Sequence, residues 1–444
     1  MNSISPIDGR YTNITNILSP YFSEISFFRY RLYIELEYFI QLSKILPELS
    51  NVNNEFTQKN IMNIHTYFSE TDYLSVKEYE KTLQHDIKAL EYFIRDKFIG
   101  LNLQQYVSFI HFAITSQDIN TSANILSLKY SMNNVIIPTI VELKNKLSII
   151  SHDMKHNVML GFTHGQPAVP TTMGKELYVY VYRLNEQLKL LYNMIYSTKF
   201  GGAIGNFNAH YASYPDINWE NFADEFINSI GLKREKVTTQ ISNYDNLCNI
   251  FNILKTINTI INDMNIDCWL YISRGYLKQK IVENEIGSST MPQKVNPINF
   301  ENSEGNICIA NSIIEGITRK LPISRLQRDL TDSTILRNIG TILAYSYISY
   351  TSSIKGLDKI DINTDIINLD LNNNASVLSE GIQTILRKYN YSDAYEKLHS
   401  ITRNGNFSNK SLEEFILSLP ENIKNEILKI KINNYFGHNN LLEI

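Results

Sequence analysis

The residues best suited to chemistry lie in the segment Gly287-Ser288-Ser289-Thr290-Met291-Pro292-Gln293-Lys294-Val295-Asn296-Pro297, which Glu301 follows. Its glycine, paired serines and proline predict a mobile loop. Lys294 and Asn296 add an ammonium and an amide, which are hydrogen-bond donors. Fixed donors of this kind can stabilise negative charge that develops on a substrate during a reaction. An ordinary surface loop would also account for the glycine, the serines and the proline.

Histidines give the second group of candidates. His164 lies in the segment Thr163-His164-Gly165-Gln166-Pro167-Ala168. A lone histidine is more often structural than catalytic, so its residue type alone leaves both interpretations open. His152 and His156 are four residues apart and could share a helix face. No HExxH glutamate or third ligand accompanies them, so a solvated face is favoured over a zinc site.

Charge and loop motifs exclude several classes of protein. The 444 residues carry a formal net charge of −4, whereas a nucleic-acid-binding protein normally shows a basic excess or stripe. A small anionic ligand is still allowed, because a few arginines in one cleft do not require a basic protein. The chain has no GxxxxGK[ST] sequence. The glycines at Gly201–Gly205 (GGAIG) neither form GxGxxG nor follow a predicted strand, so a dinucleotide-binding fold is not favoured.

The cysteines and the N-terminus suggest a cytoplasmic protein. The three cysteines, Cys248, Cys268 and Cys308, include no CxxC pair, which favours a reducing compartment over a disulfide framework. The first residues show no basic stretch followed by an apolar one, so no secretory signal is predicted. No apolar run reaches the roughly 18–20 residues of a membrane span.

Apolar residues recur at alternating steps of three and four along the middle of the chain, which predicts long amphipathic helices with one buried stripe each. The four stripes are Leu177, Val181, Leu184, Leu188, Leu191 and Ile195; Leu247, Ile250, Leu254, Ile257, Ile261, Met264 and Cys268; Ile136, Ile140, Leu143, Leu147 and Ile150; and Ile307, Ala310, Ile314, Ile317 and Leu321. With few convincing strands, the sequence predicts an all-α fold.

Breaks in this pattern predict three helical domains. Residues 1–103 form an N-terminal domain of shorter helices, with turns around Pro47 and residues 51–54. Residues 104–356 form a long-helix bundle, and residues 357–444 a smaller C-terminal helical domain. Several bundle helices are expected to reach about 20–25 residues, longer than the average helix. Such helices often associate with copies of themselves, because one chain cannot cover every apolar stripe.

Several motifs carry a resemblance to a known family. Residues 287–296 match, position by position, the GSSxMPxKxN signature of the fumarase/aspartase superfamily. The THGQPA segment resembles the histidine segment of one branch of that superfamily. Further matching blocks are PIDGRY at 6–11, His85-Asp86, Thr115-Ser116 before Asp118, Gln240, NPINFENSEGN at 296–306 and RLQRDLTDSTILR at 325–337. Together they resemble the bacterial-type adenylosuccinate lyase family over essentially the whole chain.

The resemblance implies a cofactor-free, metal-free β-elimination. Members of the family release fumarate from adenylosuccinate, which gives AMP, and from the succinyl-carboxamide imidazole ribotide of purine synthesis. The fold implied is three helical domains whose central bundles pack into a homotetramer, with each active site built from three chains. The partners implied are therefore a nucleotide substrate and copies of the same chain, with neither nucleic acid nor membrane.

The resemblance also assigns roles to residues. Ser288 is the implied general base, with Ser289 as the reserve candidate, and Lys294 and Asn296 are implied donors to the developing negative charge. His164 resembles the general acid, Glu301 its orienting carboxylate, and His85 the second active-site histidine. The implied substrate-binding residues are Arg10, Tyr11, Gln84, Asp86, Thr115, Ser116, Gln240, Asn296, Asn302, Arg328, Ser333, Thr334 and Arg337. Among them, Thr115, Ser116 and Gln240 would hold the succinyl group, and Arg10, Arg328, Ser333 and Arg337 the phosphate.

Three glutamines depart from the family pattern. Gln84 stands where asparagine usually precedes His-Asp, Gln117 where glutamate usually follows Thr-Ser, and Gln293 where histidine is frequent. Gln293 also matches the MPQK of argininosuccinate lyase. The arginine-rich block at 325–337 nevertheless favours a substrate with a phosphate, which argininosuccinate lacks.

Two alternatives stay open at this point. One is another lyase of the superfamily, such as argininosuccinate lyase or fumarase. The other is an inactive structural tetramer of the same fold. The presence of Ser288, Lys294, Asn296 and His164 argues against the second alternative. We also expect the signature loop to close over the ligand, with Gly287 as one hinge.

Overall fold

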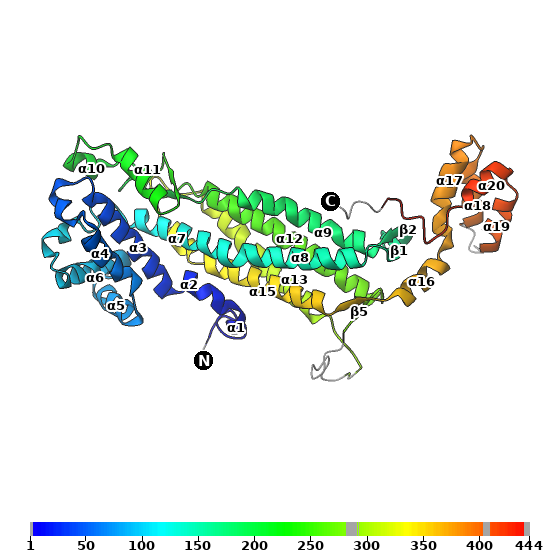
Figure 1. Cartoon of the computed structure of the whole chain (residues 1–444), viewed down its shortest axis with the longest axis horizontal. Helices are drawn as coiled ribbons and strands as arrows, with labels where there is room; N and C mark the ends of the chain where they lie inside the picture. The colour runs from blue at the N-terminus through cyan, green and yellow to red at the C-terminus, as the bar shows by residue number, and fades with distance from the viewer. Residues whose placement is uncertain (1–2, 281–290, 292, 403–408, 439–444) are drawn as a thin grey trace. The chain divides into compact units, whose positions relative to one another are not determined.

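The computed structural model describes residues 3–280, 291, 293–402 and 409–438, and most of these residues are helical (Figure 1). Strands occur in these ranges only as three two-stranded pairs. The predicted all-α fold class is therefore confirmed. No helix within the described ranges combines the length and apolar character needed to cross a membrane.

The elements follow one another in three groups along the chain. The first group is α1 (Thr12–Thr15), η1 (Asn16–Leu18), α2 (Ser19–Phe22), α3 (Glu24–Ser43), η2 (Pro47–Val52), α4 (Glu55–Thr66), α5 (Glu70–Leu83), α6 (Asp86–Gly100) and η3 (Gln104–Phe109). The middle group is α7 (Ser116–Ser131), the π-helical η4 (Met132–Ile136), α8 (Ile137–Asp153), α9 (Met173–Tyr192), α10 (Asn208–Ser213), α11 (Trp219–Ser229), α12 (Asp245–Ser273), α13 (Ile298–Lys320), α14 (Thr331–Leu336) and α15 (Ile339–Asp358). The last group is α16 (Thr364–Asn373), η5 (Ala375–Leu378), α17 (Ser379–Lys388), α18 (Ala394–Thr402), α19 (Asn409–Leu417) and α20 (Glu421–Ile427).

The strands are short and pair locally. Antiparallel pairs are β1 (Val158–Thr163) with β2 (Gln166–Thr172), and β5 (Leu277–Gln279) with β6 (Ile360–Ile362). β3 (Ser197–Lys199) and β4 (Lys233–Glu235) are parallel. β3 ends at Lys199, and only Phe200 separates it from the glycines at 201–205, so the prediction that no strand precedes them is wrong. A three-residue strand carries too weak an apolar pattern to be read from sequence.

The apolar stripes become the buried faces of the long helices. Every stripe residue of α12, from Leu247 to Cys268, is buried. The stripe from Ile307 to Leu321 is also buried, with Leu321 directly after the end of α13. Two stripe residues differ from the prediction. Ile150 is only partly buried, and Ile195 is 42% exposed because α9 ends three residues earlier, at Tyr192.

The chain divides into two compact units. The first comprises residues 1–140, 187–259 and 305–349, and the second comprises residues 141–186, 260–304 and 350–444. The boundaries cut through long helices, since α9, α12, α13 and α15 each contribute to both units. The three domains expected from the sequence are continuous segments, so their boundaries near 103 and 356 stay a prediction.

Buried polar side chains fix neighbouring helices within each unit. In the second unit, Ser353 of α15 donates to Asn265 of α12 at 2.8 Å, and Asn265 donates to Ser303 of α13 at 2.8 Å. In the first unit, Asn258 of α12 donates to Asn311 of α13 at 3.0 Å and to Ser346 of α15 at 3.2 Å. A buried amide that loses its partners costs free energy, so these contacts favour one register of the helices.

Candidate active site

In the first unit, the implied substrate-binding residues Thr115 and Ser116 lie at the start of α7. Thr115 has extended backbone angles and is the N-cap, so the helix begins at Ser116. The carboxylate of Asp118 accepts a hydrogen bond from the Thr115 backbone N–H at 2.8 Å. This contact satisfies a donor that a helix start leaves unpaired, and it fixes where the two hydroxyl side chains sit.

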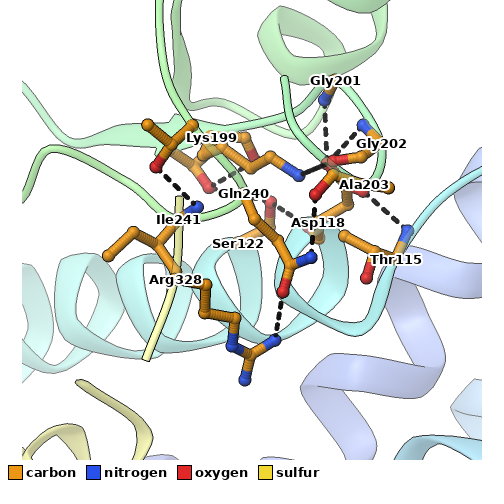
Figure 2. Close-up of polar contacts among 12 residues, drawn as sticks. Thr115, Asp118, Ser122, Lys199, Gly201, Gly202, Ala203, Gln240, Ile241 and Arg328 are labelled. Atoms are coloured by element: carbon orange, nitrogen blue, oxygen red, sulfur yellow. Dashed lines mark hydrogen bonds and ion pairs between the residues drawn. The ribbon is translucent and has the colours of Figure 1, made fainter. Parts of the chain in front are cut away.

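Asp118 also joins α7 to the glycine loop at residues 201–205 (Figure 2). Its Oδ1 atom accepts hydrogen bonds from Lys199 Nζ at 2.7 Å, from Gly201 N at 2.8 Å and from Gly202 N at 3.3 Å. The Asp118 and Lys199 side chains are both fully buried. Burial lowers the pKa of Lys199, and the charge of Asp118 opposes that shift.

Gln240 and Arg328 lie on the other side of the same loop. Gln240 Nε2 donates to the Ala203 carbonyl at 2.8 Å, and Gln240 Oε1 accepts from Arg328 Nη1 at 2.9 Å (Figure 2). The backbone N–H of Gln240 donates to the Gln327 carbonyl at 3.3 Å. The structure thus brings Thr115, Ser116, Gln240 and Arg328 to one loop, although they come from three separate parts of the sequence.

Ser333 and Thr334 lie on α14, beside a buried carboxylate that the sequence did not single out. Asp332 Oδ2 accepts from Gln117 Nε2 at 2.7 Å and from Tyr244 Oη at 2.8 Å, while Oδ1 accepts from the Ser333 N–H at 2.7 Å. Gln117 therefore serves as a neutral donor to Asp332. A glutamate at 117 would place two carboxylates in contact, which could not both be ionised at that distance.

The segment Gln84-His85-Asp86 connects α5 to α6. Gln84 has a φ of 52° and closes α5 in the left-handed conformation. His85 is the N-cap of α6, and its Nδ1 atom accepts the Lys88 N–H at 3.1 Å. In the neutral ring the proton is therefore on Nε2. The side chain is half-exposed, so its Nε2–H can donate a hydrogen bond to a ligand.

Asp86 is held by the buried Arg31. Arg31 Nη2 donates to Asp86 Oδ2 at 2.7 Å, and Arg31 Nε donates to Asn120 of α7 at 2.8 Å. Burial raises the pKa of Asp86, but the charge and hydrogen bond of Arg31, together with the Ile87 N–H, oppose this effect and the net shift is downward. Arg337 is close enough to lower the pKa of Arg31 in turn, although burial is the larger cause of that shift. Arg31 thus connects the His85 segment with α7.

The segment that contains Arg10 and Tyr11 lies against α13 and α15 in the first unit. Tyr11 packs with Ile7 and Ile14 on a cluster of buried residues on these helices: Ala310, Tyr345 and Ile348. The Thr15 hydroxyl donates to the Ile7 carbonyl at 2.8 Å and closes the turn. The apolar side chains of this segment therefore hold it against the two helices, and Arg10 is part of the segment.

In the second unit, His164 lies at the tip of the β1–β2 hairpin. Thr163 pairs with Gln166, so His164 and Gly165 are the two turn residues, with φ values of 53° and 73°. Two positive φ angles match the type I′ turn that suits a twisted hairpin. The histidine is exposed at this turn. The sequence segment THGQPA predicts no such hairpin, because its apolar alternation is weak.

A cavity of about 660 Å³ lies against the same hairpin. Its walls include Thr163 and Gly165 of the hairpin, Lys175 of α9, Asp267 of α12, and Arg274 directly after that helix, all in the second unit. Polar groups of both signs line it, so it can accept a polar ligand or a polar segment of another chain.

Lys294, Asn296, Glu301 and Asn302 precede or begin α13 in the second unit. Lys294 is exposed and its backbone N–H donates to the Met291 carbonyl at 3.0 Å. Glu301 Oε1 accepts from the Trp269 indole at 3.0 Å, and Asn302 Nδ2 donates to Ser352 at 3.2 Å. No contact between Glu301 and His164 is recorded in the part of the chain that the structure describes.

The remaining residues of the signature fall outside the described residues. These are Gly287, Ser288, Ser289, Thr290 and Pro292. The roles of Ser288 and Ser289, and the hinge at Gly287, therefore stay predictions.

Other buried charged groups were not predicted as functional. Glu35 Oε1 lies 2.6 Å from His111 Nδ1. Burial lowers the pKa of His111, but the Glu35 carboxylate, together with the charges of Glu91 and Asp118, gives a net upward shift. Burial lowers the pKa of His210 to about 4, and this ring lies 3.1 Å from the Tyr38 hydroxyl.

The capping pattern Thr115-x-x-Asp118 could have identified Asp118 from sequence, but its partner Lys199 carries no such signal. Within the described ranges, no group of three histidine, cysteine or acidic side chains is placed to hold a metal ion.

Comparisons with known proteins assign the chain to a family along its length. A lyase family model matches residues 9–310, and a model described as adenylosuccinate lyase C-terminal matches residues 324–436. Adenylosuccinate lyase of Legionella pneumophila strain Corby is 44% identical over 442 residues, which is 98% of this chain and 97% of that protein. Adenylosuccinate lyase of Dictyostelium discoideum is 46% identical over 450 residues, at 98% and 97% coverage.

Solved structures show the same fold at low sequence identity. A fumarate lyase from Mesorhizobium sp. BNC1 superposes with a TM-score of 0.77 at 14% identity and covers 96% of both chains. A β-carboxy-cis,cis-muconate cycloisomerase from Acinetobacter calcoaceticus gives 0.74 at 13% identity and covers 98% of both. At this identity the likeness establishes the fold alone.

Proposed function

The chain belongs to the adenylosuccinate lyase family, and we propose that it cleaves adenylosuccinate to AMP and fumarate by β-elimination. The same chemistry applies to the succinyl-carboxamide imidazole ribotide of purine nucleotide biosynthesis. The observation that carries this function is the identity of 44–46% to adenylosuccinate lyases over 98% of the chain. The match of the C-terminal model to residues 324–436 favours this activity over that of argininosuccinate lyase or fumarase.

The difficult step is removal of a weakly acidic proton next to a carboxylate. The resulting carbanion is stabilised as a doubly charged aci-carboxylate, so donors fixed around that carboxylate contribute most to the rate. Lys294 and Asn296 are suited to this task by residue type, and both follow the signature serines in sequence. Ser288 is proposed as the base, and its hydroxyl needs acidification by such donors because serine alone is a poor base.

Protonation of the leaving nitrogen is the second requirement. His164 is proposed as the general acid, with Glu301 as the carboxylate that orients it; general acid–base assistance of this kind contributes roughly 10²–10⁴ in rate. Its exposed position at a hairpin tip supports the role, because a buried ring could not reach substrate. His85 is proposed to contact substrate and to assist His164 through its Nε2–H.

The residues joined by the glycine loop are proposed to hold the rest of the substrate. Thr115, Ser116 and Gln240 would bind the succinyl portion, and Arg328, Ser333 and Arg337, together with Arg10, would bind the phosphate. Guanidinium groups pair with a phosphate dianion through two parallel hydrogen bonds. The contact between Arg328 and Gln240 supports a shared position for these groups. Tyr11, Gln84, Asp86, Asn302 and Thr334 complete the proposed binding set.

A homotetramer with shared active sites is the proposed assembly. In the second unit, large apolar residues stay exposed on two of the long helices: Val179 and Tyr182 on α9, and Ile266, Trp269 and Leu270 on α12. Rows of this kind on a helix face are normally covered by another surface. Self-association through these helices would cover them and allow elements from different copies to meet in one site.

The proposed compartment is the cytoplasm, where purine nucleotide synthesis takes place. Its support is the state of the three cysteines. Cys248 and Cys268 are buried thiols and Cys308 is an exposed one, none of them in a disulfide. Free thiols persist in a reducing compartment.

One assay tests the activity. Adding adenylosuccinate to the purified protein should change its absorbance as the purine substituent is lost, and chromatography should detect AMP and fumarate. Argininosuccinate, offered in parallel, should not be consumed. Unchanged adenylosuccinate over a range of pH and buffer would contradict the proposed activity and favour the inactive structural tetramer.

A further inference from the structure

The glycine loop at 201–205 connects the segments that are proposed to bind substrate. Figure 2 shows Thr115, Gln240 and Arg328 around it. Gln240 reaches the loop through the Ala203 carbonyl, and Arg328 reaches Gln240. The position of this loop therefore sets the position of both side chains.

The loop conformation is demanding and leaves little room for adjustment. Gly202 and Gly205 have φ values of 76° and 85°, which only glycine adopts readily. A Cβ at Gly205 would lie 2.3 Å from the Thr238 carbonyl oxygen, two residues before Gln240. A backbone held this closely needs a strong contact to hold it in place.

The buried Asp118–Lys199 ion pair supplies that contact. Asp118 Oδ1 accepts from Lys199 Nζ and from the N–H groups of Gly201 and Gly202, and Lys199 Nζ also donates to the Gly202 carbonyl at 2.6 Å. Both peptide groups of Gly202 are thus bound by one ion pair. The other oxygen of Asp118 holds the Thr115 N–H, so the same carboxylate fixes two of the proposed binding segments.

We propose that the Asp118–Lys199 pair is a positioning device for substrate binding, which fixes the glycine loop and, through it, Gln240 and Arg328 relative to Thr115. Neither side chain is exposed, so neither can touch substrate. The pair acts through the loop. A buried pair contributes little net stability compared with an apolar pair of equal volume, so stability alone gives a weak reason for placing one here. This inference rests on the proposed substrate-binding roles of Thr115, Gln240 and Arg328.

The test compares Asp118→Asn with Asp224→Asn. Asp224 pairs with Arg234 at 2.8 Å, and the Arg234 side chain is 4% exposed, so its loss also leaves a buried cation without its partner. Arg234 lies on β4 in the same unit. The Asp224–Arg234 ion pair does not include the glycine loop. Both variants should lower the thermal midpoint, whereas only Asp118→Asn should weaken substrate binding.

The expected result is a rise of about ten-fold or more in the KM for adenylosuccinate and in the Kd for AMP with Asp118→Asn, because small misplacements of binding groups cost this much or more. For Asp224→Asn both constants should stay within about two-fold of wild type, because Asp224 accepts from Arg234 and not from the glycine loop or the proposed binding residues. Lys199→Met should raise KM more than the charge-neutral double variant Asp118→Asn/Lys199→Met. Unchanged KM and Kd in Asp118→Asn, together with a lowered thermal midpoint, would overturn the proposal and leave the pair a purely structural role.

A second variant keeps the test decisive if Asp118→Asn does not fold. Gly202→Ala keeps both charges but strains the loop, because the alanine would need a φ of 76° with its Cβ 3.2 Å from the Ala113 carbonyl oxygen. A folded Gly202→Ala protein with raised KM supports the proposal, and one with wild-type KM contradicts it. Arg328→Ala distinguishes a failure of the proposed function from a failure of the positioning role. If wild type is active and Arg328→Ala raises KM while the Asp118 and Gly202 variants do not, the proposed function stands and the positioning role fails.

Discussion

At the residue scale, Arg328 is the side chain that best separates the proposed substrate from its nearest rivals. Its guanidinium donates to Gln240 through Nη1, and the charge of this guanidinium also lowers the pKa of Lys199, although burial is the larger cause. Fumarate lyases whose substrates lack a phosphate have no need for a guanidinium in this role. The phosphate-binding role is therefore open to a direct test.

We predict that Arg328→Ala raises the KM for adenylosuccinate by about 10- to 150-fold, since a charge-assisted hydrogen bond contributes about 1.5–3 kcal/mol. The value of kcat should fall less, because the phosphate is remote from the bond that breaks. Steady-state kinetics with adenylosuccinate measures both constants. Arg325→Ala is the matched control, because Arg325 is an exposed arginine of the same block whose ion pair to Asp329 lies on the surface. Equal KM values for wild type and Arg328→Ala would contradict phosphate binding by this residue.

His111 gives a residue-scale prediction about pH. Burial lowers its pKa, but the Glu35 carboxylate, with smaller contributions from Glu91 and Asp118, gives a net rise, so the folded-state value lies above the unfolded one. A raised histidine pKa stabilises the fold below the unfolded-state pKa, and this stabilisation is lost as pH rises through the folded-state value. The difference in thermal midpoint between wild type and His111→Gln should therefore be larger near about pH 6 than near about pH 9. Differential scanning fluorimetry at the two pH values checks this; an equal difference at both would show that the pair is not charged.

At the scale of elements, α12 shows how a sequence period becomes a structural core. Its stripe alternates steps of three and four residues, and each of those residues is buried. The same helix carries polar residues, Asn258 and Asn265, inside the bundle, where hydrogen bonds satisfy their side-chain amides. Apolar periodicity therefore fixes which face is buried, and the amides favour one register.

Leu254 tests the contribution of this stripe. It is fully buried on α12. Leu254→Ala should destabilise the protein by about 2–5 kcal/mol, because it removes apolar contacts and leaves a cavity. Asn252→Ala, at an exposed position of the same helix, should change stability by no more than about 0.5 kcal/mol. Chemical denaturation followed by circular dichroism measures both changes. A loss below about 1 kcal/mol for Leu254→Ala would mean that the stripe is not a tightly packed core.

At the scale of the whole molecule, shared active sites predict complementation between inactive copies. If His164 and Ser288 of one site come from different chains, mixing His164→Ala and Ser288→Ala subunits creates some sites with both residues intact. Equal, random mixing should restore up to about one quarter of wild-type activity, since each of the two residues is intact in half the chains.

The experiment has a direct control. Each variant is taken alone through the same dissociation and reassembly steps, and light scattering confirms an assembly of four chains of 51.3 kDa. Activity that stays at the level of the separate variants would place both residues in one chain. A mass of one chain would contradict the tetramer itself.

The sequence by itself determined the fold class, the buried helix stripes and the family. These features depend on local periodicity and on contiguous motifs, such as GSSTMPQKVN at 287–296, which do not require knowledge of distant contacts. It also provided the proposed catalytic residues, among which Ser288 lies outside the described residues.

Only the tertiary structure decided which distant residues share a contact. Asp118 and Lys199 are 81 residues apart, and Gln117 and Asp332 are 215 apart, so no spacing in the sequence predicts either pair. The His164 hairpin likewise depends on backbone pairing between two strands with weak alternation. The physical reason is the same in each case: a buried charge or amide is defined by the partner that the fold brings to it, and that partner leaves no local pattern.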